Sequence, residues 1–251
     1  MDIMAITDII TGLLNPKTKI SKSGILHGFT DWHCHILPGV DDGFQTVEDS
    51  LEILRMYEEA GIANVWFTPH IMEDMPNKTA DLKALFESFS AQYYADCEQR
   101  QGKRITLHLA AENMMDSLFD DRLAAGDLLP LLGDKLLVET SYFNPPMDLF
   151  GILQKIKSKG FFPILAHPER YMYMNDSHYQ KIKDMGVTFQ LNLASLYGGY
   201  GGDVKGKAYK LLKKGYYSMV ATDLHRVATF ERILDAKIED KYLSAIKDFI
   251  R

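Results

Sequence analysis

The feature that most constrains the fold is a regular alternation of short apolar runs with longer amphipathic segments. Because parallel strands need a crossover between them, usually a helix, this alternation favours parallel over antiparallel pairing. The runs are nearly continuously apolar, as expected for strands buried on both faces. We therefore expect an α/β fold, a small TIM-like barrel of parallel strands. The strands are predicted at residues 29–33, 64–68, 105–111, 135–140, 161–166, 187–191 and 216–222.

Helix signals fill the gaps between these runs. Thr46 is a typical N-cap, Asp49 follows three residues later, and Gly61 lies just past the last apolar position, which predicts a helix over 46–60. Apolar residues at helical spacing predict a second helix over 147–159, and a third is expected over about 80–101.

The length of 251 residues suits one domain. We place its start at Phe29, so that residues 1–28 form an N-terminal appendage, which contains the turn-prone stretch 15–19, and residues 29–251 form the barrel. No apolar run approaches the ~20 residues of a membrane span, and no secretory signal is evident. Two cysteines make no disulfide framework. A cytoplasmic protein is expected.

The charge balance limits the class of ligand. The formal net charge is −6, and basic residues do not cluster in a stripe, so a nucleic-acid partner is not expected. An anionic substrate would need local positive charge, which bound metal ions would supply.

Side chains suited to metal binding stand where the predicted strands end. The carboxyl ends of parallel strands meet on one face of a barrel, so these side chains should converge. Imidazoles and carboxylates suit Mn²⁺, Fe²⁺ or Zn²⁺. One ion takes about four to six ligands, so a larger set implies two or three ions, and such clusters activate water for attack on phosphorus. The set comprises His33, His35, Asp42, His70, Glu112, Glu139, His167, Asp223 and His225.

Each member has an ordinary explanation when taken alone. Asp41 and Asp42 precede Gly43 and could serve a turn, and Glu139 could form a structural ion pair. These explanations would have to hold separately at every strand end, so we favour the metal site. Three other histidines have no further ligand-type residues near them in the pattern and are expected at the surface or in packing: His27, His108 and His178.

Cysteine chemistry is disfavoured. Neither Cys34 nor Cys97 has an arginine six residues later, where Val40 and Lys103 stand, so a Cys-nucleophile phosphatase loop is absent. Strand alternation directs Cys34 away from its two histidine neighbours, which favours a packing role.

Six motifs together resemble the polymerase-and-histidinol-phosphatase (PHP) superfamily, and more narrowly the bacterial capsule and exopolysaccharide-locus protein-tyrosine phosphatases. The resemblance covers about residues 29–230 in order. The motifs are Asp31–Gly43 (DWHCHILPGVDDG), Thr68–His70 (TPH), Ala110–Glu112 (AAE), Leu137–Ser141 (LVETS), Ala166–Tyr171 (AHPERY) and Thr222–His225 (TDLH).

The resemblance implies a distorted (β/α)₇ barrel with three metal ions, usually manganese, with Fe²⁺ or Zn²⁺ as alternatives. Arg170 would neutralise the phosphoryl oxygens, a role that suits its planar fork; its alternative role is an ion pair with a carboxylate such as Glu169. The implied ligands are His33, His35, Glu112 and Asp223 for the first metal, Glu112, Glu139 and His167 for the second, and Asp42, His70 and His225 for the third.

The implied activity is hydrolysis of phosphotyrosine on a protein, with the Tyr-rich tail of a bacterial tyrosine kinase that governs polysaccharide export as the expected substrate. The nearest alternative is a phosphatase of a small molecule such as histidinol phosphate. An amidohydrolase would usually carry a modified lysine where Glu139 stands, and a non-catalytic relative would have lost ligands. Two departures leave roles open: Ile71 replaces a common second histidine, and the glycine-rich loop 195–202 could approach phosphate or merely form a turn.

Overall fold

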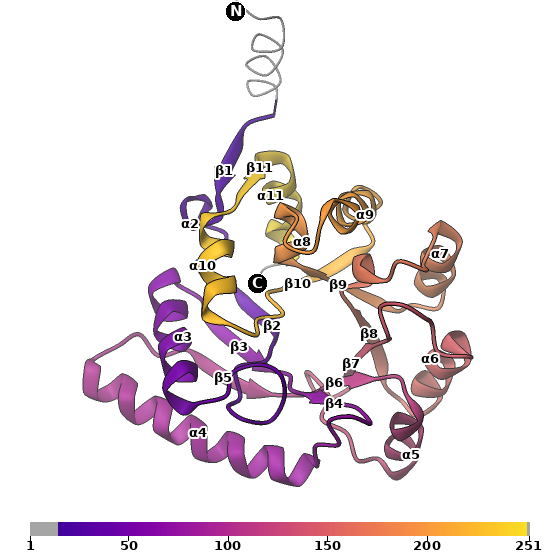
Figure 1. Cartoon of the computed structure of the whole chain (residues 1–251), viewed down its shortest axis with the longest axis horizontal. Helices are drawn as coiled ribbons and strands as arrows, with labels where there is room; N and C mark the ends of the chain where they lie inside the picture. The colour runs from indigo at the N-terminus through magenta and orange to yellow at the C-terminus, as the bar shows by residue number, and fades with distance from the viewer. Residues whose placement is uncertain (1–14, 250–251) are drawn as a thin grey trace, which may run out of the picture.

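The computed structural model describes residues 15–249, in which nine parallel strand segments form two sheets (Figure 1). The larger sheet has the order β10-β9-β8-β7-β6-β4, and the smaller has the order β2-β3-β5. All pairs within these two sheets are parallel, which confirms the expected α/β architecture. Their bounds are β2 Thr30–Cys34, β3 Asn64–Phe67, β4 His70–Ile71, β5 Thr106–Leu109, β6 Glu112–Met114, β7 Lys135–Glu139, β8 Phe162–Ala166, β9 Thr188–Asn192 and β10 Tyr217–Ala221.

Two of the predicted strands are interrupted. The run at 64–68 forms β3 and continues, after Pro69, as β4 in the other sheet, and the run at 105–111 forms β5 and is followed by β6. Proline has no N–H to donate to a strand ladder, which explains the first break. Hydrogen bonds from Thr68 N to Cys34 O (2.9 Å) and from Ala110 N to Phe67 O (2.8 Å) tie the breaks to neighbouring strands.

The last strand meets the first only beyond the end of β10. Asp223 N donates to His33 O (2.8 Å), and His35 N donates to Leu224 O (2.9 Å). A single parallel bridge between Cys34 and Leu224 accompanies these bonds. Among residues 15–249 the parallel strands therefore form two sheets joined at their carboxyl ends, and a fully closed barrel stays a prediction.

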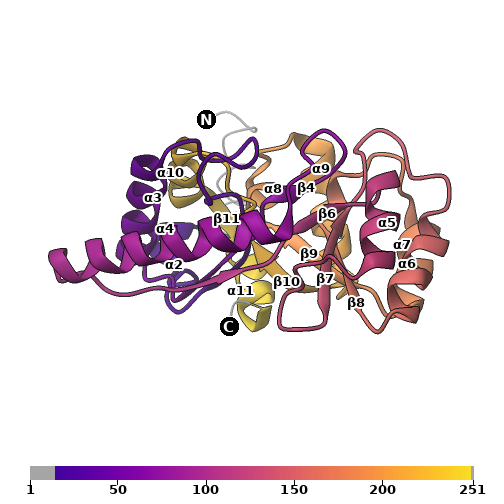
Figure 2. The same ribbon diagram turned by 90° about the horizontal axis from the view of Figure 1, so that it is seen from below.

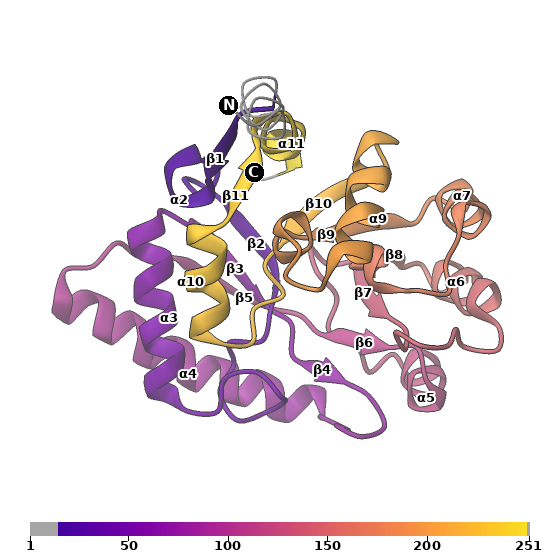
Figure 3. The same cartoon turned by 45° about the horizontal axis from the view of Figure 1, so that its top comes forward.

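Helices surround the strands, as the views in Figures 2 and 3 show. The helix predicted over 46–60 is α3, where Thr46 Oγ1 accepts from Asp49 N (3.1 Å) and Gly61 adopts a left-handed φ of 83°. The helices are α2 Ile20–Ser23, α3 Val47–Ala60, α4 Thr79–Arg100, α5 Ser117–Ala125, α6 Leu149–Ser158, α7 Asp176–Asp184, α8 Leu193–Tyr197, α9 Gly202–Lys213, α10 Val227–Asp235 and α11 Asp240–Ile246, with 3₁₀ turns at Pro168–Arg170 and Lys247–Phe249.

A small apolar cluster lies among the strands, separate from the main core between strands and helices. Its members are Trp66, Ala110, Leu131, Leu137, Ile164, Ala166 and Met219. Leu137 stands two residues before Glu139 on β7, so the two side chains point to the same face. The apolar cluster therefore forms a floor beneath the carboxyl-end face, where the polar side chains gather.

The described part of the predicted appendage packs on the rest of the chain. Strand β1 (Lys17–Lys19) pairs antiparallel with β11 (Lys237–Glu239), and Ile20, Ile25 and Leu26 are buried. Residues 1–14 lie outside the described residues, and the boundary at Phe29 stays a prediction. No helix within 15–249 is long and apolar enough to cross a membrane.

Candidate metal centre

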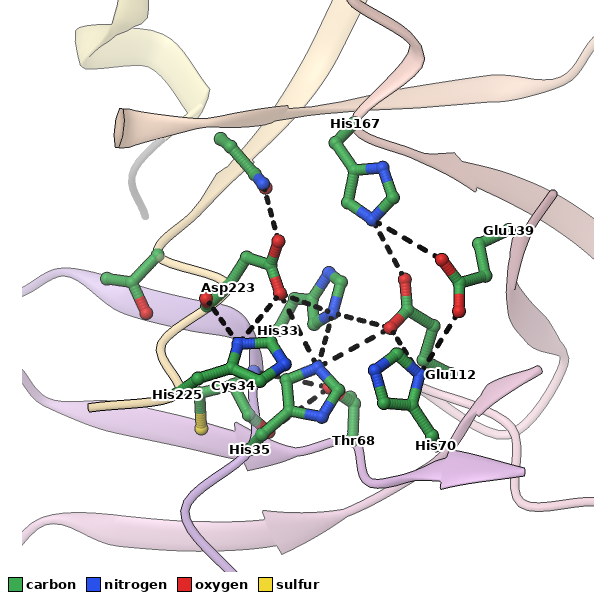
Figure 4. Close-up of polar contacts among 12 residues, drawn as sticks. His33, Cys34, His35, Thr68, His70, Glu112, Glu139, His167, Asp223 and His225 are labelled. Carbon is green, nitrogen blue, oxygen red and sulfur yellow. Dashed lines mark hydrogen bonds and ion pairs between the residues drawn. The ribbon is translucent and has the colours of Figure 1, made fainter. Parts of the chain in front are cut away.

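All nine predicted ligand residues lie together on the face where the carboxyl ends of the strands meet. Eight of them are labelled in Figure 4, and Asp42 lies beside His70 and His225. Seven of them are buried, whereas His225 is half-buried and Asp42 is exposed in the loop after β2. Residues spread over nearly two hundred positions of sequence therefore meet at one site, as the parallel-strand argument predicts.

Four buried side chains form the first group of candidate ligands. His33 Nε2 lies 3.2 Å from Glu112 Oε2 and 3.4 Å from Asp223 Oδ1. His35 Nε2 lies 3.4 Å from the same Glu112 oxygen. One donor atom from each of the four side chains falls within 4.8 Å of all the others. Two imidazole nitrogens and two carboxylate oxygens at this spacing suit a borderline divalent cation.

In His33 and His35, the ring nitrogen that faces away from the centre, Nδ1, is hydrogen-bonded. Gln190 Oε1 accepts from His33 Nδ1 (2.9 Å), and Asp41 Oδ2 accepts from His35 Nδ1 (2.7 Å). A hydrogen bond at one ring nitrogen fixes the tautomer and leaves the other free to bind a metal. Asp41 was expected among the polar residues after the first strand, but not as the partner of His35, and Gln190 was not predicted to act here. The only signal for Gln190 is one polar residue inside the apolar run 187–191.

His70 and Glu112 connect the remaining ligands. His70 Nδ1 lies 3.1 Å from both Glu112 Oε2 and Glu139 Oε1, and its Nε2 lies 3.6 Å from Asp42 Oδ1. His167 Nε2 lies 3.0 Å from the other oxygen of Glu112. Both oxygens of Glu112 are thus engaged, in a position suited to bridging two ions. A further group within the 4.8 Å limit contains His35, Asp42, His70 and His225.

Several buried polar atoms at this centre have no hydrogen bond. They are His70 Nδ1, Glu112 Oε2 and Glu139 Oε1, which approach one another without the alignment of a hydrogen bond. A buried, unsatisfied polar group costs about 1–3 kcal/mol, more when it is charged. Three such atoms facing one point therefore fit cations that would coordinate them.

The histidines and carboxylates of the site shift one another's pKa values. Burial alone would raise the pKa of Glu112, but the neighbouring His33 and His70 hold it well below its usual range. Burial alone would lower the pKa of His33, but the Glu112 and Asp223 carboxylates raise it to about 9. A proton on His33 thus offsets part of the carboxylate charge, a role that divalent cations would take over.

Arg170 lies at the edge of the ligand cluster, on the 3₁₀ turn after β8. Its Nη1 donates to Asp223 Oδ2 (2.9 Å). Its guanidinium lies between the rings of Tyr142 (4.1 Å) and Tyr200 (4.3 Å). The carboxylate pair named as the alternative role of Arg170 is present, but with Asp223. Glu169 is engaged elsewhere, since it accepts from Ser195 Oγ, Tyr217 OH and Asn192 N. The arginine is therefore fixed in the cleft and oriented by Asp223.

A cleft of about 560 Å³ opens above the centre. Its lining includes Arg170 and five of the candidate ligands, namely Asp42, His70, Glu139, Asp223 and His225. Its sides carry aromatic and thioether groups, namely Tyr142, Tyr197, Tyr200, Met72, Met75 and Met114. Tyr142 and Tyr200 lie in loops, where sequence periodicity carries no signal. Such a cleft accepts a ligand with an anionic head and an apolar body.

The side chains set aside from the sequence lie apart from the centre. Cys34 is buried with its thiol donating to Trp66 O (3.3 Å), and burial, followed by Asp31, raises its pKa well above the usual value. A protonated, buried thiol is a poor nucleophile. His108 stacks on Trp66, and His178 completes the capping box of α7.

Comparison with known proteins agrees with this geometry. The sequence model of the family described as "Capsular polysaccharide synthesis, CpsB/CapC" matches residues 29–242. Tyrosine-protein phosphatase YwqE of Bacillus subtilis is 28% identical over 205 residues, which cover 79% of this chain and 78% of that protein. The putative tyrosine-protein phosphatase CapC of Staphylococcus aureus is 22% identical over 86% of this chain and 84% of its own length.

A solved structure with a similar fold agrees with the family match. It comes from crystal structures of YwqE from Bacillus subtilis and CpsB from Streptococcus pneumoniae, described as metal-dependent tyrosine phosphatases. It superposes with a TM-score of 0.70 at 27% identity and covers 80% of this chain and 81% of its own. The family match spans most of the sequence and the whole ligand cluster, so the chain belongs to the capsular polysaccharide synthesis CpsB/CapC family.

Proposed function

We propose that this protein is a metal-dependent protein-tyrosine phosphatase. The observation that carries the proposal is the convergence of nine imidazole and carboxylate side chains beside one cleft, where buried oxygens and nitrogens face each other without hydrogen bonds. Relatives named tyrosine-protein phosphatases, one of them metal-dependent by description, support the substrate class.

We propose three ions with the distribution expected from the sequence, manganese foremost and Fe²⁺ or Zn²⁺ as alternatives. His33, His35, Glu112 and Asp223 would hold the first. Glu112 would be shared with Glu139 and His167, and Asp42, His70 and His225 would complete the set. When bound, such ions supply a nucleophile from water at neutral pH and offset the charge of the phosphoryl oxygens.

The protein's own groups bind and orient the phosphoryl group. Arg170 lines the cleft, and its Nη1 is held by Asp223, so the remaining guanidinium N–H groups are available to phosphoryl oxygens. Tyr142 and Tyr200 hold the guanidinium plane from both sides. A donor fixed before the substrate arrives costs no reorganisation in the transition state.

A phenol leaving group suits the residues of this cleft. A phenol has a pKa near ~10, so it leaves with less help from a general acid than an aliphatic alcohol does. The aromatic and thioether sides of the cleft, Tyr142, Tyr200, Met72 and Met114 among them, would contact the substrate's phenyl ring. These features favour phosphotyrosine over a small aliphatic phosphate such as histidinol phosphate.

The biological setting belongs to the same proposal. The family name points to capsular polysaccharide synthesis, and the substrate we propose is the Tyr-rich tail of a tyrosine kinase that controls it. We propose cytoplasmic action, a seven-stranded barrel over residues 29–251 as the catalytic unit, and residues 1–28 as an appendage to it.

A metal-replacement assay tests the proposal. The protein is stripped of metal, Mn²⁺, Fe²⁺, Zn²⁺ and Mg²⁺ are returned separately, and hydrolysis of phosphotyrosine peptides is compared with hydrolysis of histidinol phosphate. We expect no activity without metal, the highest activity with Mn²⁺, and a preference for the peptide. A preference for histidinol phosphate would make the protein a small-molecule phosphatase.

A further inference from the structure

The cleft above the metal centre is not closed at its sides. A second hollow of about 530 Å³ adjoins it, and the two share Met72, Met114 and Tyr142 in their walls. The second hollow runs between the turn after β4, the start of α5 and the loop 141–147 that follows β7. Together the two hollows form one groove that extends from the metal centre past Met72, Met114 and Tyr142.

The two ends of this groove carry opposite charges. One end is formed by α10, which places the exposed Arg226 and Arg232 at the cleft. The other end carries the exposed Glu73 and Asp74, with Asp116 beside them. In both Figure 2 and Figure 3, α10 and α5 lie on opposite sides of β4. Arg226 and Arg232 belong to the first of these helices and its N-cap, and Asp116 caps the second.

The two arginines are free to bind a ligand. Neither forms an ion pair with any carboxylate among residues 15–249, although the chain carries 34 acidic residues against 28 basic ones. Arg100, by contrast, contacts Glu58 and Asp96, and Arg55 contacts Asp96. Two unpaired guanidinium groups beside a cleft attract an anionic partner.

The opposite end offers apolar surface as well as negative charge. In the loop 141–147, Phe143 is 84% exposed and Met147 is fully exposed, and Pro145 and Pro146 line the hollow with Phe143. Exposed aromatic and proline groups beside a groove are typical of surfaces that contact polypeptide.

We propose that this groove binds an extended segment of the substrate polypeptide on both sides of the phosphotyrosine, with acidic residues of the substrate directed toward Arg226 and Arg232. Glu73 and Asp74 repel acidic residues on the other side and favour basic or apolar ones. The groove thereby fixes the direction in which the chain crosses the site. This inference rests on the proposed phosphotyrosine phosphatase function.

Two isomeric phosphopeptides test the inference. Both contain one phosphotyrosine; one has two glutamates before it and two lysines after it, and the other has the reverse order. Their composition and net charge are identical, so non-specific attraction cannot separate them. We expect the metal-loaded protein to hydrolyse one isomer with a kcat/KM roughly five- to tenfold higher, mainly through KM, as expected for a few exposed ion pairs.

Two double variants locate the preference. R226A/R232A should reduce the ratio between the isomers to about twofold or less, and E73Q/D74N should also narrow it. The matched control is K103A/R104A, which removes two exposed positive charges before β5, at the end of the strands remote from the site, and should keep the full ratio.

The outcomes separate the two claims. The proposal that the groove binds the substrate chain is overturned if the two isomers have equal kcat/KM. It is also overturned if R226A/R232A leaves the ratio of their kcat/KM values unchanged. In both cases the proposed phosphatase function stands. Failure of the metal-loaded protein to hydrolyse either isomer overturns the proposed function and the groove with it.

Discussion

The half-buried Arg170 forms an ion pair with the buried Asp223, and the two oxygens of Asp223 have separate contacts. Oδ2 accepts from Arg170 Nη1 (2.9 Å) and from Asn192 Nδ2 (2.7 Å), whereas Oδ1 lies 3.4 Å from His33 Nε2. One carboxylate thus connects the arginine proposed to contact the substrate with the first group of metal ligands. The division of labour between these two residues can be separated by mutation.

Arg170→Ala should lower kcat by about 10²–10³, the usual cost of losing one transition-state donor. Metal content should stay nearly unchanged, because Asn192 still holds Oδ2 of Asp223. Arg170→Lys should recover little, since an ammonium lacks the planar fork. Rates and elemental analysis of each variant make the comparison. Loss of metal or unfolding in Arg170→Ala would mean that the arginine is a structural partner of Asp223 and not a substrate contact.

Glu112→Ala should lower metal content and activity together, and by more than one ion per chain, because both oxygens of Glu112 face other candidate ligands. His33→Ala should lose fewer ions, since only one of its ring nitrogens faces the centre. Glu58→Gln is the control, because this carboxylate pairs with Arg100 away from the centre. If Glu112→Ala keeps the full metal content, the bridging assignment is wrong.

Cys34→Ser and Cys97→Ser should each keep most of the phosphatase activity. Both thiols are buried, and burial raises the pKa of each, so neither is available as a thiolate. Steady-state rates should be read beside metal content, since Cys34 lies between two candidate ligands. An inactive variant that retained its metal would point to thiol chemistry.

Metal binding should release protons and tighten as pH rises toward about 9. The Glu112 and Asp223 carboxylates, acting against burial, raise the pKa of His33 to about 9 in the metal-free protein. Below that pH the imidazole carries a proton that must leave before it can coordinate, so protons compete with the metal. Calorimetric titration of stripped protein with Mn²⁺ at pH 7, in two buffers of different ionisation enthalpy, measures the release. Identical heats in both buffers would contradict it.

The sequence predicts that the candidate ligand side chains converge, because their positions follow a topological rule. A polar residue at the carboxyl end of an apolar parallel strand must lie on one face, whatever the loops do. His70 and Glu112 illustrate this, since each begins a short strand, β4 or β6, that the sequence did not separate from its predecessor. The breaks before β4 and β6 place His70 and Glu112 in the larger sheet, whereas β3 and β5 belong to the smaller one. Both residues still lie on the face that carries the other candidate ligands.

What the sequence does not predict is the support around the ligands. Tyr142 and Tyr200 reach Arg170 from loops after β7 and α8, and no periodicity locates a loop side chain in space. Asn192 could have been found, because it ends the predicted strand near 187–191 as the ligands end theirs. The sequence also could not identify Asp223 as the partner of Arg170, because the two are 53 residues apart and only the fold brings them together.

The central claim is that activity depends on a cluster of bound divalent metals. Its most direct test is the metal content of the purified protein, measured by elemental analysis, together with phosphotyrosine hydrolysis before and after chelation and after return of Mn²⁺. We predict more than one divalent ion per chain, loss of activity on stripping and recovery on return of metal. A metal-free preparation with full activity would contradict the account.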